Sequence, residues 1–297
     1  MRHAILGAGG VGGMIGACLA RVGEAVTLVV RPGTLADHPP RLQFESPFGN
    51  WSVEVGWAGS VPASDVLWLT VKATQLEAAI LSIADAPATA AIVPLLNGIE
   101  HIERLRSQFG SERVIPATIA GEMERVSVGH FVHRSPFAVL NISERGRSLL
   151  QTTSERLRSL GITCNFVYDE TTLMWTKLSF LGPFALTTSA FDRTIGEVVA
   201  DPSTWEQLER CVRETCAAGQ AEGAKIDADV VLPLIRKAPP AMRSSMQKDL
   251  EHGRPPELDA IGGVIVRAAR RHGLLVPVTE LLMAKIGRRT VASLRSS

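Results

Sequence analysis

The stretch Ala4–Gly12 reads Ala-Ile-Leu-Gly-Ala-Gly-Gly-Val-Gly, and it decides the fold of the first half of the chain. Three apolar residues suited to a buried strand run directly into glycines, and residues 11–22 follow in a helical pattern. A G-x-G-x-x-G pattern in this strand–turn–helix context is typical of dinucleotide binding. Gly7 allows the tight turn, Gly9 lets the backbone approach a pyrophosphate, and Gly12 lets the helix pack closely on the strand. A glycine-rich turn without a ligand is the alternative that this context disfavours.

The residue after the second apolar run indicates which dinucleotide is bound. That run ends at Val30 and Arg31 follows it, whereas no acid lies between Glu24, which precedes the run, and Asp37. A free ribose 2′-hydroxyl is usually held by an acid near this point, and a 2′-phosphate by a cation. Arg31 therefore favours NADPH/NADP+ over NAD(H) or FAD, the alternative being an exposed loop arginine. Lys72, at the end of a later apolar run, is either a second cation near the cofactor or a solvated strand-end lysine.

The first half continues as an alternation of apolar runs and helical patterns, which is the signature of an α/β domain. The runs at 25–30, 66–71 and 91–96 are apolar throughout, as parallel strands covered by helices on both faces must be. Between residues 114 and 143 the strands are shorter and alternate in polarity, so we expect antiparallel pieces appended to the sheet. The sequence thus predicts an N-terminal Rossmann-type doubly wound sheet over residues 1–168.

After residue 168 the pattern changes to long helical periods without convincing strands. Prolines interrupt these periods mostly near expected helix starts. We therefore expect an all-helical C-terminal domain over residues 169–297.

Composition limits the class of protein. The 297 residues are 45% apolar and 21% charged with a net charge of +1, which fits about two globular domains and lacks the basic excess of a nucleic-acid binder. No uninterrupted apolar run reaches the length of a membrane span, so none is expected. The cysteines have no metal-binding spacing, and we expect no metal site, reduced thiols and a cytoplasmic protein. The four are Cys18, Cys164, Cys211 and Cys216.

Lys177 is the first candidate for chemistry, because it lies in the otherwise apolar helical run Leu173–Leu181. Burial would lower the pKa of its ammonium and make it a better acid near neutral pH. Beside a nicotinamide it could stabilise the charge that develops on a carbonyl oxygen and donate the proton. The residues alone slightly favour the alternative, a lysine whose stem covers the apolar surface while its charge reaches solvent.

Three further positions have a structural and a functional interpretation. Glu257 follows two prolines and begins a helix, where an acid also stabilises the helix dipole. Ser244 and Ser245 are suited to capping a helix. Asn97 and Gly98 form a turn signal, yet they also lie at the carboxyl edge of the predicted sheet, where α/β folds bind ligands.

Taken together, these motifs resemble the ketopantoate reductase family (2-dehydropantoate 2-reductases, ApbA/PanE-like), and the resemblance covers nearly the whole chain. The N-terminal motif is shared by many dehydrogenases, whereas the ordered set of Lys177, Ser-Ser-Met and Glu-Leu-Asp is far more specific. The matching segments are Ile5–Gly12, Arg31, Thr70–Gln75, Leu96–Ile99, Gly129–His133, Trp175–Leu178, Ser244–Asp249 and Glu257–Asp259.

The resemblance implies NADPH-dependent reduction of a 2-oxo acid, ketopantoate or a relative, to the 2-hydroxy acid, which for ketopantoate is a step of pantothenate biosynthesis. Lys177 matches the catalytic lysine and general acid, and Glu257 the acid that hydrogen-bonds the substrate. Ser245 matches a substrate-binding serine, and Asn97 an asparagine near nicotinamide and substrate. With the resemblance, a catalytic Lys177 is clearly favoured. The implied cofactor-binding residues are Gly7, Gly9, Gly10, Val11, Gly12, Arg31, Lys72, Gln75 and Asn97.

The chain departs from the family pattern after Lys177. Asparagines that touch the substrate usually follow the catalytic lysine by about one and two helical turns, but here Leu181 and Ala185 occupy those positions. A site that reads its substrate through hydrogen bonds loses specificity when the partners are removed. We therefore expect a different and more apolar 2-oxo acid. Pro183, between the two positions, is expected to disturb the helix.

Two other functions remain open. The first is a dehydrogenase acting on another carbonyl or hydroxy substrate, and the second is a non-catalytic NADP(H)-binding sensor, which the presence of both Lys177 and Glu257 disfavours. We expect a small-molecule substrate between the domains, and closure that brings Lys177 and Glu257 towards the nicotinamide near Asn97. Nucleic-acid and membrane partners are not expected, and a homodimer is considered by analogy only.

Overall fold

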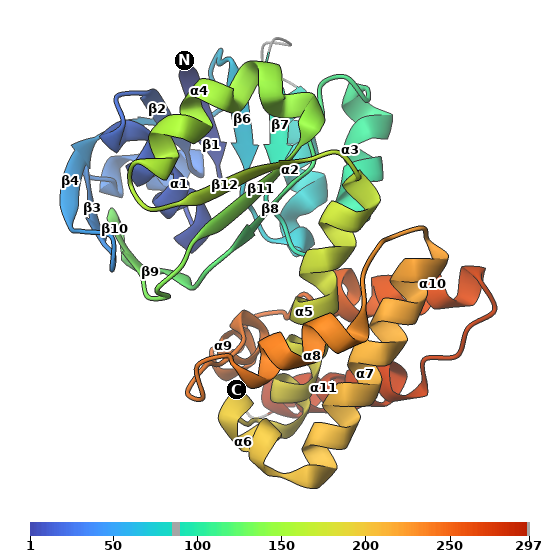
Figure 1. Ribbon diagram of the computed structural model, residues 1–297. Helices are drawn as coiled ribbons and strands as arrows, with labels where there is room; N and C mark the ends of the chain where they lie inside the picture. Colours follow the sequence, from blue (N-terminus) through green and yellow to red (C-terminus); the bar gives the residue numbers. More distant parts are fainter. Residues whose placement is uncertain (85–89, 296–297) are drawn as a thin grey trace. The chain divides into compact units, whose positions relative to one another are not determined.

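The computed structural model describes residues 1–84 and 90–295 and divides the chain into two compact units (Figure 1). The first unit consists of Met1–Leu96 and His101–Glu170. The second consists of Asn97–Glu100 and Thr171–Ser297, of which residues 296 and 297 lie outside the described part. Nothing in the sequence indicated that the short segment Asn97–Glu100 groups with the helical unit.

The first unit is built on a five-stranded sheet with the order β5-β2-β1-β6-β7, and every pairing in it is parallel. Strand order proceeds in opposite directions from β1, so the switch point of a doubly wound sheet lies between β1 and β6. The apolar β6 is buried along its whole length, as predicted for a strand covered on both faces. The strands are β1 (Arg2–Leu6), β2 (Ala25–Val29), β5 (Gly56–Ala58), β6 (Val66–Leu69) and β7 (Ala91–Pro94).

The remaining strands correct one prediction. They form two further sheets, with the orders β4-β3-β10-β9 and β12-β11-β8, rather than antiparallel extensions of the main sheet. Both contain a parallel pair, β3–β10 and β11–β12. Among the described residues, only an isolated bridge between Ile92 and Val114 continues the main sheet. The bounds are β3 (Arg41–Glu45), β4 (Trp51–Glu54), β8 (Ala117–Ala120), β9 (Met123–Ser127), β10 (His130–His133), β11 (Val139–Ser143) and β12 (Thr163–Val167).

A buried helix lies between the main sheet and the sheet β4-β3-β10-β9. Helix α1 contacts β2 of the main sheet and also β3, β4, β9 and β10 of the second sheet. Residues 12–19 of α1 are all buried, so the helix offers an apolar surface to both sheets, and the alternating strands place their apolar side against it. The helical elements of this unit are α1 (Gly10–Arg21), η1 (Pro32–Asp37), η2 (Ala73–Gln75), α2 (Leu76–Ala84), α3 (His101–Phe109), η3 (Glu144–Gly146) and α4 (Arg147–Arg158).

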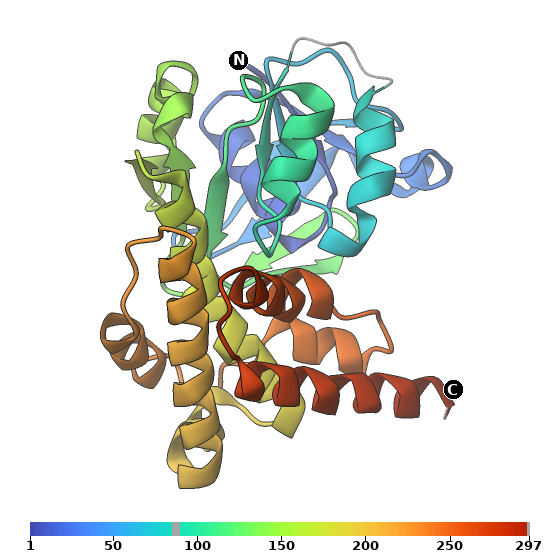
Figure 2. The same cartoon turned by 90° about the vertical axis from the view of Figure 1, so that its right-hand side faces the viewer.

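The second unit is helical, as predicted, and no strand occurs among its described residues (Figure 2). Its centre is formed by α5, whose Trp175, Leu178 and Leu186 pack with residues of α7, α10 and α11. None of the described helices is long and apolar enough to cross a membrane. The elements are α5 (Glu170–Phe191), α6 (Ile195–Ala200), α7 (Pro202–Ala221), α8 (Ala228–Arg236), α9 (Ser245–Glu251), the π-helical turn η4 (Asp259–Gly263), α10 (Val264–Arg271) and α11 (Pro277–Arg295).

Pro183 does not interrupt its helix, contrary to expectation. Helix α5 runs from Glu170 to Phe191 with Pro183 inside it, and residues 182–190 are all buried. The proline still removes the N–H that would bind the carbonyl of Ser179. Packing of the buried half of α5 holds the helix together despite this lost bond, as tertiary contacts commonly override local preference.

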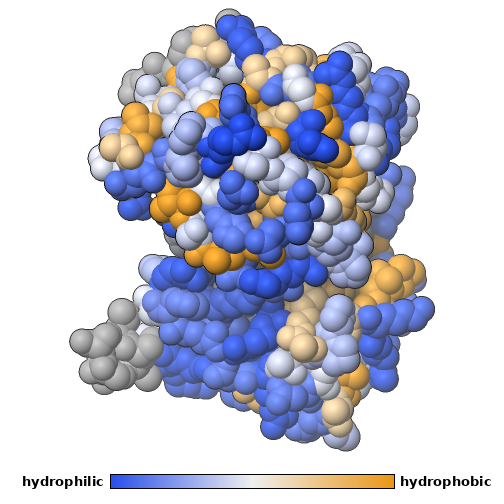
Figure 3. All heavy atoms as spheres, turned by 90° about the vertical axis from the view of Figure 1, so that its left-hand side faces the viewer, coloured by the Kyte–Doolittle hydropathy of each residue, from blue (hydrophilic) through white to orange (hydrophobic). Residues whose placement is uncertain are grey.

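The surface offers no single large apolar patch on the face drawn in Figure 3, where hydrophilic residues cover most of the helical unit. The large apolar side chains that remain exposed are distributed over both units, and they include Leu81, Tyr168, Val230, Leu234 and Leu275. All four cysteines are buried and free, and burial raises the pKa of the Cys18 thiol. They behave as small apolar residues.

Candidate active site

The glycine turn lies at the switch point of the main sheet, between β1 and α1. Gly7 has a φ of +110°, and a Cβ there would stand 2.9 Å from the backbone of Thr70 and Val71. A Cβ on Gly12 would stand 2.0 Å from the Gly7 carbonyl oxygen. The Thr70 hydroxyl donates to that same oxygen at 2.7 Å and fixes the turn against β6. Packing inside the protein therefore accounts for these two glycines.

Gly9 is different, because nothing in the protein requires a glycine there. Its φ of −84° suits any residue, and no atom lies within 4 Å of the place where a Cβ would stand. Gly9 is the N-cap of α1, which has no side-chain cap and no acid in its first turn. The first N–H groups of such a helix lack intrahelical partners and attract anions. The open space over Gly9 fits a phosphate group of a dinucleotide.

The neighbouring residues tie this turn to β9. A Cβ on Gly10 would stand 2.4 Å from the Met123 carbonyl oxygen, and Val11 is partly buried against the core of the unit. Arg125 of β9 donates from Nη1 to the Ala8 carbonyl oxygen at 3.4 Å. This exposed cation beside the turn was missed by sequence reasoning, because the contact joins residues 117 positions apart and depends on how α1 packs on β9.

The other predicted cofactor residues follow strands on either side of β1. Arg31 follows β2 as the N-cap of η1, and its exposed guanidinium has no partner among the described residues. Lys72 follows β6 as the N-cap of η2 and is partly buried, whereas Gln75 ends η2 and is exposed. The carboxyl ends of β1, β2 and β6 lie at one edge of the sheet, so these residues are placed along the edge where α/β folds bind ligands.

In the second unit, Asn97 and Glu257 are brought together although 160 positions separate them. The Asn97 side-chain amide donates to Glu257 Oε2 at 2.9 Å. Glu257 is only 7% exposed and precedes the helix that begins at Leu258, to which its carbonyl contributes by accepting from the Ile261 N–H at 3.1 Å. The acid is thus a buried hydrogen-bonding group rather than a solvated partner of the helix dipole. No domain closure is needed to bring Asn97 to Glu257.

Lys177 lies on α5, partly buried, and forms neither a hydrogen bond nor an ion pair with a described residue. Burial lowers the pKa of its ammonium to about 8, and the nearby Glu257 carboxylate opposes this shift. An amine with a pKa close to neutral is suited to giving up a proton. The two groups therefore share a local electrostatic environment without being bonded to each other.

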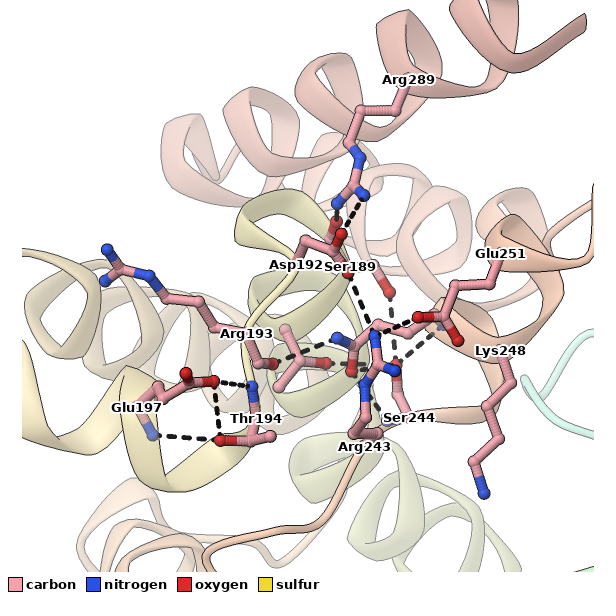
Figure 4. A network of polar contacts seen from close by, with 12 residues as sticks. Ser189, Asp192, Arg193, Thr194, Glu197, Arg243, Ser244, Lys248, Glu251 and Arg289 are labelled. Carbon is pink, nitrogen blue, oxygen red and sulfur yellow. Dashed lines mark hydrogen bonds and ion pairs between the residues drawn. The ribbon is translucent and has the colours of Figure 1, made fainter.

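The two serines have different environments, and Figure 4 shows that of Ser244. Ser244 is buried as the N-cap of α9, where it forms a capping box with Gln247 and accepts a hydrogen bond from the Thr188 hydroxyl at 3.1 Å. Ser245 is the exposed first residue of α9, and its hydroxyl has no partner in the described part of the chain. The capping interpretation is confirmed for Ser244, and the hydroxyl of Ser245 remains available to a ligand.

The two positions that depart from the family pattern offer no polar side-chain atom to a substrate. Leu181 is partly buried, and Ala185 belongs to the apolar core of the second unit. They follow Lys177 at intervals of four along α5, so all three lie near one side of the helix. Within the described residues, no group of three or more histidines, cysteines or acids is placed to hold a metal ion.

Comparison with known proteins identifies the family. The model "Ketopantoate reductase PanE/ApbA" matches residues 3–146, and the model of the C-terminal domain of the same family matches residues 170–289. The chain belongs to the ketopantoate reductase family. Membership places it among nicotinamide-dependent oxidoreductases that reduce 2-oxo acids and confirms the resemblance derived from its motifs.

Individual relatives agree over almost the full length. A 2-dehydropantoate 2-reductase of Mycobacterium tuberculosis is 33% identical over 301 residues, covering 94% of this chain and 95% of the relative. The crystal structure of a PanE/ApbA family ketopantoate reductase from Ralstonia eutropha JMP134 has a TM-score of 0.88 at 25% identity and covers 98% of this chain and 99% of its own. D-mandelate dehydrogenase, in a ternary structure with NADH and anilino(oxo)acetate, shares the fold with a TM-score of 0.86 at 19% identity, covering 98% and 99%.

Proposed function

We propose that this protein reduces a 2-oxo acid to its 2-hydroxy acid with NADPH, and that Lys177 is the general acid. The observation that carries the proposal is the combination, within one unit, of the partly buried Lys177, whose pKa burial lowers to about 8, and the hydrogen bond between Asn97 and the buried Glu257. The residues 1–168 would bind the cofactor, and residues 169–297 would carry the substrate and the catalytic groups. Asn97 is the exception, since it groups with the second unit.

The cofactor residues fit the group they would hold. The turn from Gly7 to Gly12 and the N-terminus of α1 would bind the pyrophosphate, with Arg125 beside the turn as an added positive charge. Arg31 would pair with the 2′-phosphate, and Lys72 and Gln75 would complete the site. When bound, the nicotinamide supplies a hydride to the carbonyl carbon of the substrate.

The catalytic residues would handle the charge and the proton. Negative charge develops on the carbonyl oxygen as the carbon is reduced, and the Lys177 ammonium would stabilise it and donate a proton to it. Glu257 and Asn97 would hydrogen-bond the substrate and fix its orientation, and the exposed Ser245 hydroxyl would contact its polar groups. Burial of Glu257 and partial burial of Lys177 and Asn97 would strengthen their interactions with the substrate, because water competes less.

The substrate we propose is a 2-oxo acid with an apolar side chain rather than ketopantoate. Leu181 and Ala185 offer carbon surface where the family pattern has asparagines. The complex of D-mandelate dehydrogenase with anilino(oxo)acetate illustrates that this fold accommodates an aromatic oxo acid. A role in pantothenate biosynthesis would follow only if ketopantoate were the substrate.

A panel of 2-oxo acids tests the proposal, with NADPH and NADH each supplied and absorbance loss as the readout. We expect turnover with NADPH and a preference for apolar side chains. Ketopantoate as the best substrate by a wide margin would remove the specificity argument. Tight NADPH binding without turnover of any member would favour the sensor.

Assembly and location complete the proposal. We propose a cytoplasmic enzyme that forms a homodimer and needs no nucleic-acid or membrane partner. Light scattering on the purified chain measures its mass directly, and a monomer at micromolar concentration would contradict the dimer.

A further inference from the structure

Arg267 of α10 holds two carboxylates that come from different segments of the second unit. Its Nε and Nη2 donate to both oxygens of Glu100, at 2.9 and 2.6 Å. Its Nη1 and Nη2 donate to both oxygens of Asp259, at 2.7 and 3.2 Å. A guanidinium is suited to such forked binding because its donors lie in one rigid plane.

The two carboxylates flank the Asn97–Glu257 hydrogen bond. Glu100 ends the segment that begins with Asn97, and Asp259 lies two residues beyond Glu257. Arg267 therefore joins the two chain segments that supply the two partners of that bond. The connection closes a ring of contacts from Asn97 through Glu257, Asp259 and Arg267 to Glu100.

Two glycines allow close contacts within this ring. Gly98 has a φ of +82°, and a Cβ there would stand 2.3 Å from the Ala260 carbonyl oxygen. A Cβ on Gly263 would stand 2.3 Å from Asp259 Oδ1 and 2.9 Å from Arg267 Nη1. Ile99, between the bonded residues, packs against the apolar core of the unit. The segment 97–100 is thus fitted to the helix by packing as well as by charge.

We propose that Arg267 is a positioning residue, which fixes the segment 97–100 against the start of the helix and so aligns Asn97 with Glu257. The inference rests on the proposed function to the extent that these two residues bind the substrate. A surface ion pair without functional consequence is the competing explanation, since the side chains of Arg267, Glu100 and Asp259 are 39%, 44% and 82% exposed.

Substitutions separate the two explanations. Arg267→Gln removes both ion pairs. Arg267→Lys keeps a positive charge that can pair with one carboxylate, but an ammonium lacks the planar set of donors that binds two carboxylates at once. Glu100→Gln weakens only the link to the segment 97–100, because the side chain loses its charge and one of the two oxygens that accept from Arg267. Arg271→Gln is the matched control. Arg271 lies on α10 like Arg267, but it pairs with Glu222 at the end of α7 and takes no part in the ring.

Steady-state kinetics on the 2-oxo acid found by the panel is the first measurement. We expect Arg267→Gln to lower kcat/KM by roughly 10-fold or more, chiefly through a higher KM for the oxo acid, because misaligned binding groups cost binding and orientation. Arg267→Lys should recover part of the loss, and Arg271→Gln should stay within about twofold of the parent. Thermal melting should show all four variants folded.

Hydrogen exchange of the backbone amides at 97–100 is the second measurement, and it needs no substrate. We expect faster exchange in Arg267→Gln and Glu100→Gln and unchanged exchange in Arg271→Gln. If Arg267→Gln matches Arg271→Gln in both kinetics and exchange, Arg267 is an ordinary surface ion pair and the inference is wrong. If the parent protein reduces no oxo acid, the proposed function fails, and the exchange experiment still decides whether Arg267 holds the segment.

Discussion

A partly buried ammonium group among apolar residues of a helix destabilises the fold, and Lys177 is such a group. Burial lowers the pKa of Lys177 from 10.5 to about 8, so the charged form is less favourable in the folded protein than in the unfolded chain. Below pH 8 both states carry the proton and the full cost is present. Between about 8 and 10.5 only the unfolded chain keeps the proton, so stability should rise with pH in this window.

Replacement of Lys177 should therefore separate activity from stability. We expect Lys177→Met to lower kcat by about 10²–10⁴-fold, because the proton donor is lost. The same variant should be more stable at pH 7 by on the order of 1–3 kcal/mol, because one pKa unit is worth about 1.4 kcal/mol. Chemical denaturation and steady-state rates measure the two effects, with the exposed Lys237→Met as the control. Near-normal turnover would exclude Lys177 as the acid.

The pH profile of the reduction gives an independent measure of the same group. The ammonium form donates the proton, so kcat/KM for the oxo acid should fall as pH rises through about 8. Lys177→Arg should abolish this limb together with most of the rate, because a guanidinium stays protonated throughout the range. An unchanged alkaline limb in that variant would assign the titration to another residue.

Arg31 carries the prediction about the cofactor. Arg31→Ala should weaken NADPH by roughly 10-fold or more and leave NADH almost unaffected, because only NADPH has the 2′-phosphate with which a cation can pair. Fluorescence titration of each nucleotide measures both constants, and Arg21→Ala, at the other end of the neighbouring α1, is the control. Equal weakening of both nucleotides would contradict the assignment.

At the scale of elements, the glycine turn gives the sharpest contrast. Gly12→Ala should destabilise the protein by several kcal/mol or prevent folding, because its Cβ meets the Gly7 carbonyl oxygen at 2.0 Å. The added Cβ of Gly9→Ala meets no protein atom. The folded state should therefore lose only the small stability difference between glycine and alanine at an N-cap. Its NADPH affinity should nevertheless fall by about 10-fold or more, because the Cβ occupies space we assign to the pyrophosphate.

Calorimetry with and without NADPH tests this pair of variants. A Gly9→Ala protein that melts like the parent and binds NADPH equally well would show that the space over Gly9 has another purpose. A well-folded Gly12→Ala protein would show that helix α1 can move away from β1 without loss of the fold.

The elements were predicted from sequence to the extent that local pattern determined them. Strand β6 is apolar throughout and was recognisable as a buried parallel strand. Strands β9 and β10 alternate in polarity, which indicated strands but not their sheet. The reason is that β10 pairs with β3, which is distant in sequence, and the packing of α1 brings the two strands together. The prediction that Pro183 would disturb its helix was wrong for a related reason, since burial of α5 outweighs one lost backbone hydrogen bond.

At the scale of the whole molecule, the sequence predicted individual candidate residues better than the contacts between them. Lys177, Glu257 and Asn97 were each named from motifs, but the bond between Asn97 and Glu257 and the grouping of Asn97–Glu100 with the helical unit depend on contacts more than a hundred residues apart. Arg125 and Arg267 carried no motif at all. Their candidate roles follow from three-dimensional contacts with residues that did carry one.

If the two units bind cofactor and substrate separately, a substitution in the second unit should change substrate preference without changing cofactor affinity. Leu181 is the position to test, because it is partly buried and tolerates a polar group better than the fully buried Ala185. Leu181→Asn should raise kcat/KM for ketopantoate relative to an apolar 2-oxo acid by about 10-fold or more, since a hydrogen-bonding partner is restored and carbon surface is lost.

NADPH affinity should stay within about twofold, and Leu181→Met should leave the preference unchanged because it keeps an apolar side chain of similar size. A Leu181→Asn enzyme with the parent's preference would show that the substrate does not contact this position of α5.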